Sequence, residues 1–160
     1  MEYKIKNIVK GALIYTIGDT IASLLLGQFN LYRLLGMILI GSTVYAFEIP
    51  NYFNWIAKTT KEYSGLKLSI YKTGLAILYF NPLWIARHLL FIKLISFRFT
   101  EINIGLFHIA FMSFLVNIPI SIIANYIIQN KMPLNLRFIS SAIFSGLMAI
   151  YYALSAIWFN

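Results

Sequence analysis

Residues 14–26 read IYTIGDTIASLLL, an apolar stretch that carries one charged residue, Asp19. A charge at the centre of a bilayer costs about 2.5–3.5 kcal/mol on insertion scales, so such residues usually face a protein interior or a water-filled path. The stretch therefore predicts a membrane-embedded helix whose Asp19 side points into the protein. Asp19 is the first candidate for a residue of the core or of a pore.

The remainder of the chain has the same apolar character. Of its 160 residues 60% are hydrophobic and only 11% are charged, whereas a soluble surface needs roughly 25% charged residues. Apolar runs of about twenty residues or more, long enough to cross roughly 30 Å of hydrocarbon as helices, recur at about 8–27, 33–55, 68–97, 104–128 and 136–159. We predict an all-α fold, a polytopic transmembrane helical bundle of four to five spans, because it is open whether the last two runs both cross. Residues 1–160 form one integral membrane domain.

Basic residues are distributed unevenly between the two ends of these runs. One set comprises Lys4, Lys6, Lys10, Lys58, Lys61, Lys67, Lys72, Lys131 and Arg137, and the opposite set comprises Arg33, Lys93 and Arg98. Lysine and arginine are enriched on the cytoplasmic side of membrane proteins. We therefore expect the amino terminus on the cytoplasmic or matrix-equivalent side, with the first run retained as a span.

Several function classes lack support in the sequence. The net charge of +8 does not gather into a basic stripe with exposed aromatics, so nucleic acid is not an expected partner. The chain has no cysteine, and its two histidines lie in different predicted spans without a metal-ligand spacing. Nucleophile elbows and phosphate-binding glycine loops are also missing. We expect no enzyme activity, no metal and no cofactor.

In the first predicted span, Ala12, Thr16, Asp19, Ser23 and Gly27 share one helical face. Small residues let a neighbouring helix approach closely, and hydroxyl groups can hydrogen-bond across the contact. This face has two interpretations. It lines a pore or relay centred on Asp19, or it is a tight helix contact in which a buried partner neutralises Asp19.

The third run carries a positive charge, Arg87, well inside a predicted span. Arg87 needs an acidic partner there, and the embedded acids are Asp19 and Glu48, so we expect an Asp19–Arg87 or a Glu48–Arg87 pair. Glu48 precedes Pro50, whose bend could aim it inward, although it could equally lie at the membrane interface. His88 titrates near neutral pH and is either a proton sensor or a structural residue. Asn81 shares the face of His88.

The fourth run carries a row of polar residues at every fourth position: Ser113, Asn117, Ser121 and Asn125. Such a row drifts by about 40° per step on an α-helix and so winds around it, as a crossing helix contact would. Asn117 and Asn125 are therefore candidates for a helix contact or a pore lining.

Taken together, some of these motifs resemble a known family. They are Gly18-Asp19, Pro82, Pro119 six residues before Asn125-Tyr126, Pro133 four residues before Arg137, and Tyr151 in the last run. This order resembles the peroxisomal membrane protein family of Mpv-seventeen type, small basic multi-span proteins of mitochondrial inner and peroxisomal membranes. The likeness covers about residues 8–159 and implies a helical bundle thought to form a channel for small solutes. The chain departs from the family at Ser23, Ile118 and Met148-Ala149, where the family has Gln, an aromatic residue and Trp-Asn.

We therefore expect a channel-like integral membrane protein for small solutes or ions, in the mitochondrial inner membrane or alternatively a bacterial plasma membrane. The alternative is a structural accessory subunit of a large membrane complex, such as a respiratory-chain complex, without transport activity. A translocator of lipid-linked sugars has the same size but no matching motif. Expected partners are the lipid bilayer and either further copies of the chain or subunits of a larger complex.

Overall fold

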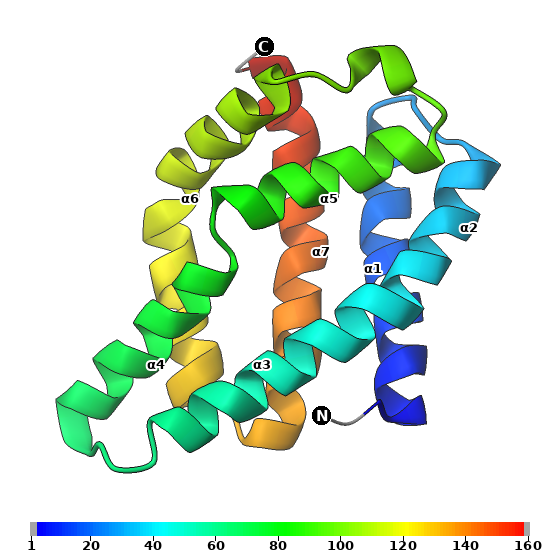
Figure 1. Ribbon diagram of the computed structural model, residues 1–160. Coiled ribbons are helices and arrows are strands. Elements are labelled where there is room, and N and C mark those ends of the chain that lie inside the picture. Colours follow the sequence, from blue (N-terminus) through cyan, green and yellow to red (C-terminus); the bar gives the residue numbers. More distant parts are fainter. Residues whose placement is uncertain (1–2, 159–160) are drawn as a thin grey trace.

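The computed structural model describes the backbone of residues 3–158 and the side chains of residues 3–148, 150 and 151. The chain is 84% helical, and no strand occurs in the part described (Figure 1). The helices are α1 (Ile5–Leu25), α2 (Leu31–Ile40), α3 (Ala46–Thr59), α4 (Gly65–Tyr79), α5 (Pro82–Ile95), α6 (Gly105–Asn130) and α7 (Leu134–Trp158). The predicted all-α helical bundle is confirmed.

Within the described residues, four helical units are long and apolar enough to cross a membrane: Ile5–Leu25, Leu31–Thr59, Gly65–Ile95 and Gly105–Asn130. The apolar part of α7 for which side chains are described, Leu134–Met148, is shorter than a span. Large apolar side chains also cover the outside of the bundle, among them Leu13, Ile17, Leu39, Leu78 and Ile123. The molecule is therefore an integral membrane protein.

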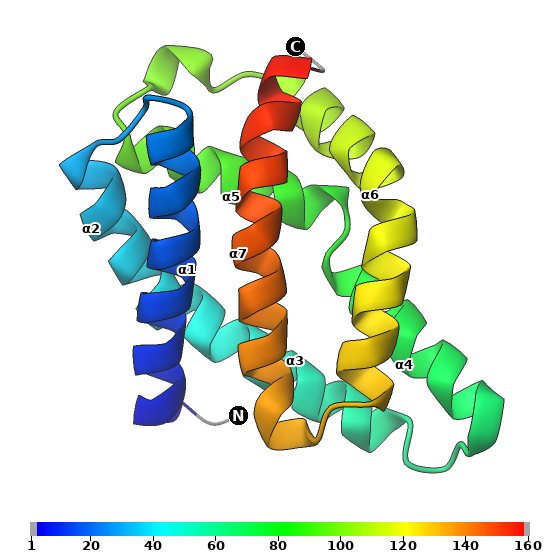
Figure 2. The same ribbon diagram turned by 180° about the vertical axis from the view of Figure 1, so that it is seen from behind.

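The helices form two layers. Helices α1, α7 and α6 stand side by side in one layer, as the view from behind shows (Figure 2). The α2–α3 and α4–α5 units cross the other face of this layer obliquely (Figure 1). The start of α1 and the last turn of α7 lie at opposite ends of the bundle in both views (Figures 1 and 2).

The long third run is divided where the sequence places Asn81 and Pro82. The Asn81 Oδ1 accepts a hydrogen bond from the Trp84 backbone N–H at 3.1 Å and so caps α5. Pro82 occupies the first helical position, where its missing N–H leaves no bond unmade. Asn81, which we expected to line a pore or a helix contact, is instead a helix cap. Its short side chain reaches the free N–H groups of its own helix, and this fixes its position.

The second run forms a continuous helix from Leu31 to Thr59, but the centre of this helix is π-helical and not α-helical. Residues Gly41–Tyr45 form a π-helical segment between α2 and α3, and Pro50 lies inside α3. A π segment inserts extra residues into a turn and is frequent at functional sites. It also brings Gly41 against α1, where a Cβ on Gly41 would stand 2.6 Å from the Gly11 carbonyl oxygen.

The buried face of α1 is turned by about one residue from the predicted one. Gly11, Gly18 and Asp19 are buried, whereas Thr16 is only half-buried and Gly27 is exposed. The reason is a second close approach, because a Cβ on Gly18 would stand 2.5 Å from the Gly146 Cα of α7. The glycines at 11 and 18, seven residues apart, therefore set the contact face of α1.

Candidate functional site

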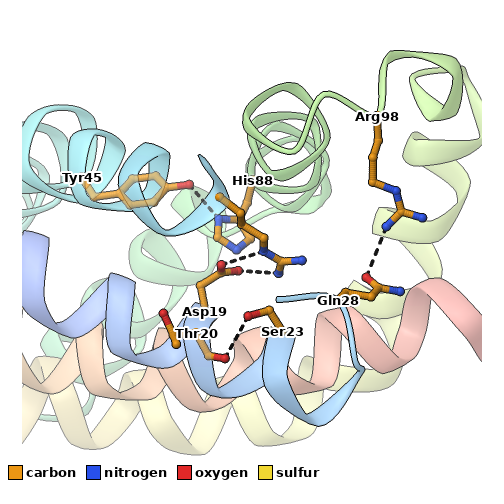
Figure 3. Close-up of polar contacts among 8 residues, drawn as sticks. Asp19, Thr20, Ser23, Gln28, Tyr45, His88 and Arg98 are labelled. Carbon is orange, nitrogen blue, oxygen red and sulfur yellow. Dashed lines mark hydrogen bonds and ion pairs between the residues drawn. The ribbon is translucent and has the colours of Figure 1, made fainter. Parts of the chain in front are cut away.

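Asp19 forms a buried ion pair with Arg33. The Arg33 Nε donates to Asp19 Oδ2 at 2.7 Å, and Arg33 Nη2 donates to Asp19 Oδ1 at 2.6 Å. Only 3% of the Asp19 side chain and 5% of the Arg33 side chain are exposed. Figure 3 shows the carboxylate of Asp19 with its two dashed contacts. This two-point geometry is the strongest arrangement available to an arginine and a carboxylate.

The turn between α1 and α2 brings the two residues together. Gly27 adopts a positive φ of 64° that ends α1, and the Asn30 side chain caps α2 by accepting from the Tyr32 backbone N–H. Arg33 in the first turn of α2 then lies beside the last turns of α1. Of the two pairs expected as alternatives for Arg87, the one with Asp19 does not form, because Asp19 pairs with Arg33. Arg33, which the charge count assigned to a connection between spans, is a core residue.

A second polar contact lies next to this pair. The Tyr45 hydroxyl and His88 Nδ1 are 2.8 Å apart, and both residues are buried. Trp84 stacks on the His88 ring with 5.6 Å between centroids and 6° between planes. Figure 3 shows Tyr45 and His88 pointing toward one another, with His88 beside Asp19. His88 is thus held by an aromatic cage and lies within electrostatic range of Asp19.

The expected Glu48–Arg87 pair is confirmed. Arg87 Nη1 donates to Glu48 Oε1 at 2.9 Å, and Arg87 Nη2 donates to Oε2 at 2.6 Å. The Tyr79 hydroxyl donates to the same Oε2 at 2.8 Å, so three helical segments, α3, α4 and α5, meet at one carboxylate. About a third of each charged side chain is exposed, 33% for both. Glu48 is thus directed at Arg87 while keeping access to the surface.

An open cleft of about 750 Å³ lies beside Glu48. Its lining is polar and aromatic, with a lysine from each of two distant segments: Lys4, Phe47, Glu48, Asn51, Tyr52, Asn54, Trp55, Lys58 and Tyr79. The cleft follows the outer side of α3 toward the end of the bundle that holds Lys58. Glu48 is therefore the point at which the polar interior meets the surface.

The polar row of α6 is buried, and several of its side-chain hydrogen bonds run along its own helix, while Tyr151 of α7 donates to the Ser113 carbonyl at 2.9 Å. The Asn117 amide donates to Ser121 Oγ at 2.8 Å, and the Asn125 amide donates to the Ser121 carbonyl at 2.9 Å. In α1, Ser23 Oγ similarly donates to the Thr20 carbonyl at 2.9 Å, which Figure 3 also shows. The row faces α5 and α7, where Ser121 and Asn125 line a small cavity with Trp84. Its geometry is that of a polar helix contact.

Arg33, Tyr45 and Tyr79 are the site residues that sequence reasoning missed. The available signal for Arg33 was the short break of about five residues between the first two runs, since short connections place helices side by side. Tyr45 had no such signal, because its partner His88 is brought to it only by the packing of α5 against the α2–α3 unit. Among the described residues, no group of three or more histidines and acidic residues could hold a metal ion.

No family model, no curated protein and no solved structure matches the chain. The resemblance to the Mpv-seventeen type family therefore depends on the motifs alone, and the site has to be interpreted from its own chemistry.

Proposed function

We propose that the chain is a channel-like protein that passes small solutes or ions across an organelle or bacterial inner membrane. The observation that carries this proposal is a set of three polar contacts along the α2–α3 unit: Asp19 with Arg33, Tyr45 with His88, and Glu48 with Arg87 and Tyr79. We call this set the polar column. Ionisable groups inside a membrane domain usually mark solute pathways or proton relays.

The polar column follows one continuous helical unit. Arg33, Tyr45 and Glu48 lie on this unit, and the fifteen residues from Arg33 to Glu48 correspond to about 22 Å of helix. The 750 Å³ cleft continues from Glu48 toward Lys58. Because the α2–α3 unit crosses the bundle obliquely (Figure 1), this length is an upper limit to the depth that the column covers.

In this proposal the Asp19–Arg33 pair is the gate. The pair is closed, because both side chains are almost fully buried and the carboxylate uses both oxygens on the guanidinium. Passage would require the pair to separate or the carboxylate to take up a proton. The π segment Gly41–Tyr45 and the glycine contacts of α1 are the places where such a movement of α2 against α1 would occur.

The membrane orientation follows from the same residues. Since Arg33 is buried, it no longer counts among the loop charges, and Lys93 and Arg98 are both paired with Glu101. The unequal distribution of basic residues therefore becomes stronger, and it supports an amino terminus on the cytoplasmic or matrix side. The family resemblance favours the mitochondrial inner membrane, with a bacterial plasma membrane as the alternative.

Reconstitution into liposomes tests the proposal. Wild-type protein should release small trapped solutes or carry single-channel currents, and Asp19→Asn should change the conductance or its dependence on pH. The exposed Lys131→Gln is the matched control and should behave like wild type. Absence of any flux or current from the wild type, over a range of voltage and pH, would rule the channel out.

One observation favours the alternative function of an accessory subunit. An apolar groove of about 290 Å³ lies over the close contact of α1 and α7, lined by Ile14, Ile17, Gly18, Ile21, Ile143, Gly146, Leu147 and Ile150. Such a groove would accept a helix of a partner subunit. Native gels of mild-detergent extracts distinguish the two functions, because an accessory subunit migrates with a large assembly and an independent channel migrates as a small oligomer.

A further inference from the structure

Arg137, at the start of α7, is a buried cation without an acidic partner. It is 8% exposed, and its Nε donates to the Met132 carbonyl at 3.1 Å, while its Nη1 is buried without a hydrogen-bond partner. A buried guanidinium needs charge compensation as well as hydrogen bonds. The arginine therefore lacks an anion.

Three carboxylates of the chain form ion pairs with other basic residues. Only five acidic residues occur in the sequence. Asp19, Glu48 and Glu101 each form ion pairs far along the chain from Arg137. No carboxylate in the described part of the chain forms an ion pair with Arg137. The missing anion has to come from outside this set.

The surroundings of Arg137 add positive potential. Lys72 of α4 lies close enough for its charge to interact with that of Arg137. Arg137 also stands near the amino terminus of α7, the positive end of the helix dipole, and the first turn of α7 has no acidic residue. Repulsion between these groups would be relieved by a bound anion.

Gln129 provides a further unpaired group on the other side of the α6–α7 turn. It is 0% exposed, and neither its amide nitrogen nor its amide oxygen has a hydrogen-bond partner. Gln129 and Arg137 thus flank the same short turn, and each has a buried donor without a hydrogen-bond partner. We call Lys72, Gln129 and Arg137 the Arg137 cluster.

We propose that the Arg137 cluster binds the phosphate of an anionic phospholipid headgroup. The cluster lies at the end of the bundle that carries the turn between α3 and α4, with Lys61 and Lys67, and Lys131 follows α6 there (Figures 1 and 2). Basic pockets between membrane helices on the cytoplasmic or matrix side bind such headgroups. Exposed Leu134 and Leu136 stand next to Arg137, where an acyl chain would cover them. This apolar border favours a lipid over a free phosphate ion.

Binding of short-chain lipids to the delipidated full-length protein in a neutral detergent tests the proposal. Phosphatidylglycerol should raise the unfolding temperature and remain bound in native mass spectra, whereas phosphatidylcholine of the same chain length should do neither. Lys72→Gln should weaken phosphatidylglycerol binding by about fivefold, and Arg137→Gln by at least as much. Lys131→Gln, which removes an exposed lysine at the same end, is the matched control and should leave binding within about twofold of wild type.

Three results would overturn the proposal. Equal binding of the two lipids, or unchanged binding in Lys72→Gln, removes the headgroup site. If inorganic phosphate alone saturates the site, and the protein then no longer distinguishes the two lipids, the cluster binds free anions instead. If Arg137→Gln does not fold, the comparison of Lys72→Gln with Lys131→Gln still decides, because both replace lysines at or near the surface.

Discussion

The carboxylate of Asp19 and the guanidinium of Arg33 are joined at two points across the turn between α1 and α2, at 2.7 and 2.6 Å. Both side chains are buried, so neither charge has an alternative partner in solvent. The pair fixes the first helical hairpin and stands at the closed end of the polar column. Its loss affects both stability and the proposed gate.

Asp19→Asn and Arg33→Gln should each destabilise the protein by about 3–5 kcal/mol, because each leaves one buried charge uncompensated. The double variant Asp19→Leu/Arg33→Met should recover most of this loss, since an apolar pair leaves no charge behind. Reversible unfolding in mixed micelles measures these differences. If the single variants unfold like wild type, the pair does not stabilise the bundle.

The all-α class followed directly from the sequence, because hydrocarbon permits only helices or closed barrels and the runs had helical length. The interior was harder to predict. Glu48–Arg87 could be expected because Arg87 sits deep within an apolar run. Arg33 lies at the edge of one, where a snorkelling arginine and a buried arginine have the same sequence signature. Only the turn of α1 onto α2 distinguishes the two.

Helix rotation was the other property that the sequence left open. Thr16 and Gly27 belong to a small-residue face, but Gly11 and Gly18 approach other backbones more closely, and this rotates α1. A glycine in a membrane helix gives no sign of which neighbour it contacts. The Gly18–Gly146 contact joins residues of the first and last helices, so no local pattern could have shown it.

Gly18→Ala should destabilise the bundle by about 1–3 kcal/mol, because the added Cβ would stand 2.5 Å from the Gly146 Cα, and backbone cannot yield as a side chain can. Gly74→Ala is the matched control. A Cβ at Gly74 meets nothing within 4 Å, and alanine is the better helix former, so this variant should be neutral or stabilised by up to about 1 kcal/mol. Equal stability of the two variants would contradict the close contact of α1 and α7.

Glu101, in the connection between α5 and α6, should make the stability of the protein depend on pH. Burial alone would raise the pKa of Glu101, but the hydrogen bonds and charges of Lys93 and Arg98 outweigh it and hold the pKa below its ordinary value. The unfolded carboxyl therefore takes up its proton first as the pH falls. The contribution of Glu101 is fully present above the unfolded pKa of about 4.3 and is lost as the pH falls through the lower folded value.

Unfolding of wild type and Glu101→Gln measured between pH 3 and pH 7 checks this, the range being set roughly by the carboxyl pKa. The difference in stability should be constant above about pH 5 and should shrink below about pH 4. Glu62→Gln, at an exposed turn position, is the control and should change the stability little. A difference that grows on acidification would show that Lys93 and Arg98 do not stabilise the ionised carboxyl.

The Glu48–Arg87 pair should contribute to stability less than the buried Asp19–Arg33 pair does. Glu48→Gln should cost about 1–2 kcal/mol, less than Asp19→Asn, because a third of each side chain at this pair is exposed and water can solvate the remaining arginine. The swap Glu48→Arg/Arg87→Glu should recover part of the stability lost by either single charge reversal. It should not recover all of it, since the Tyr79 hydroxyl donates to the carboxylate at 2.8 Å and would have to turn and accept from a guanidinium after the swap. Unfolding free energies of these variants measure the coupling, and a swap as unstable as the sum of its single reversals would show that Glu48 and Arg87 do not interact.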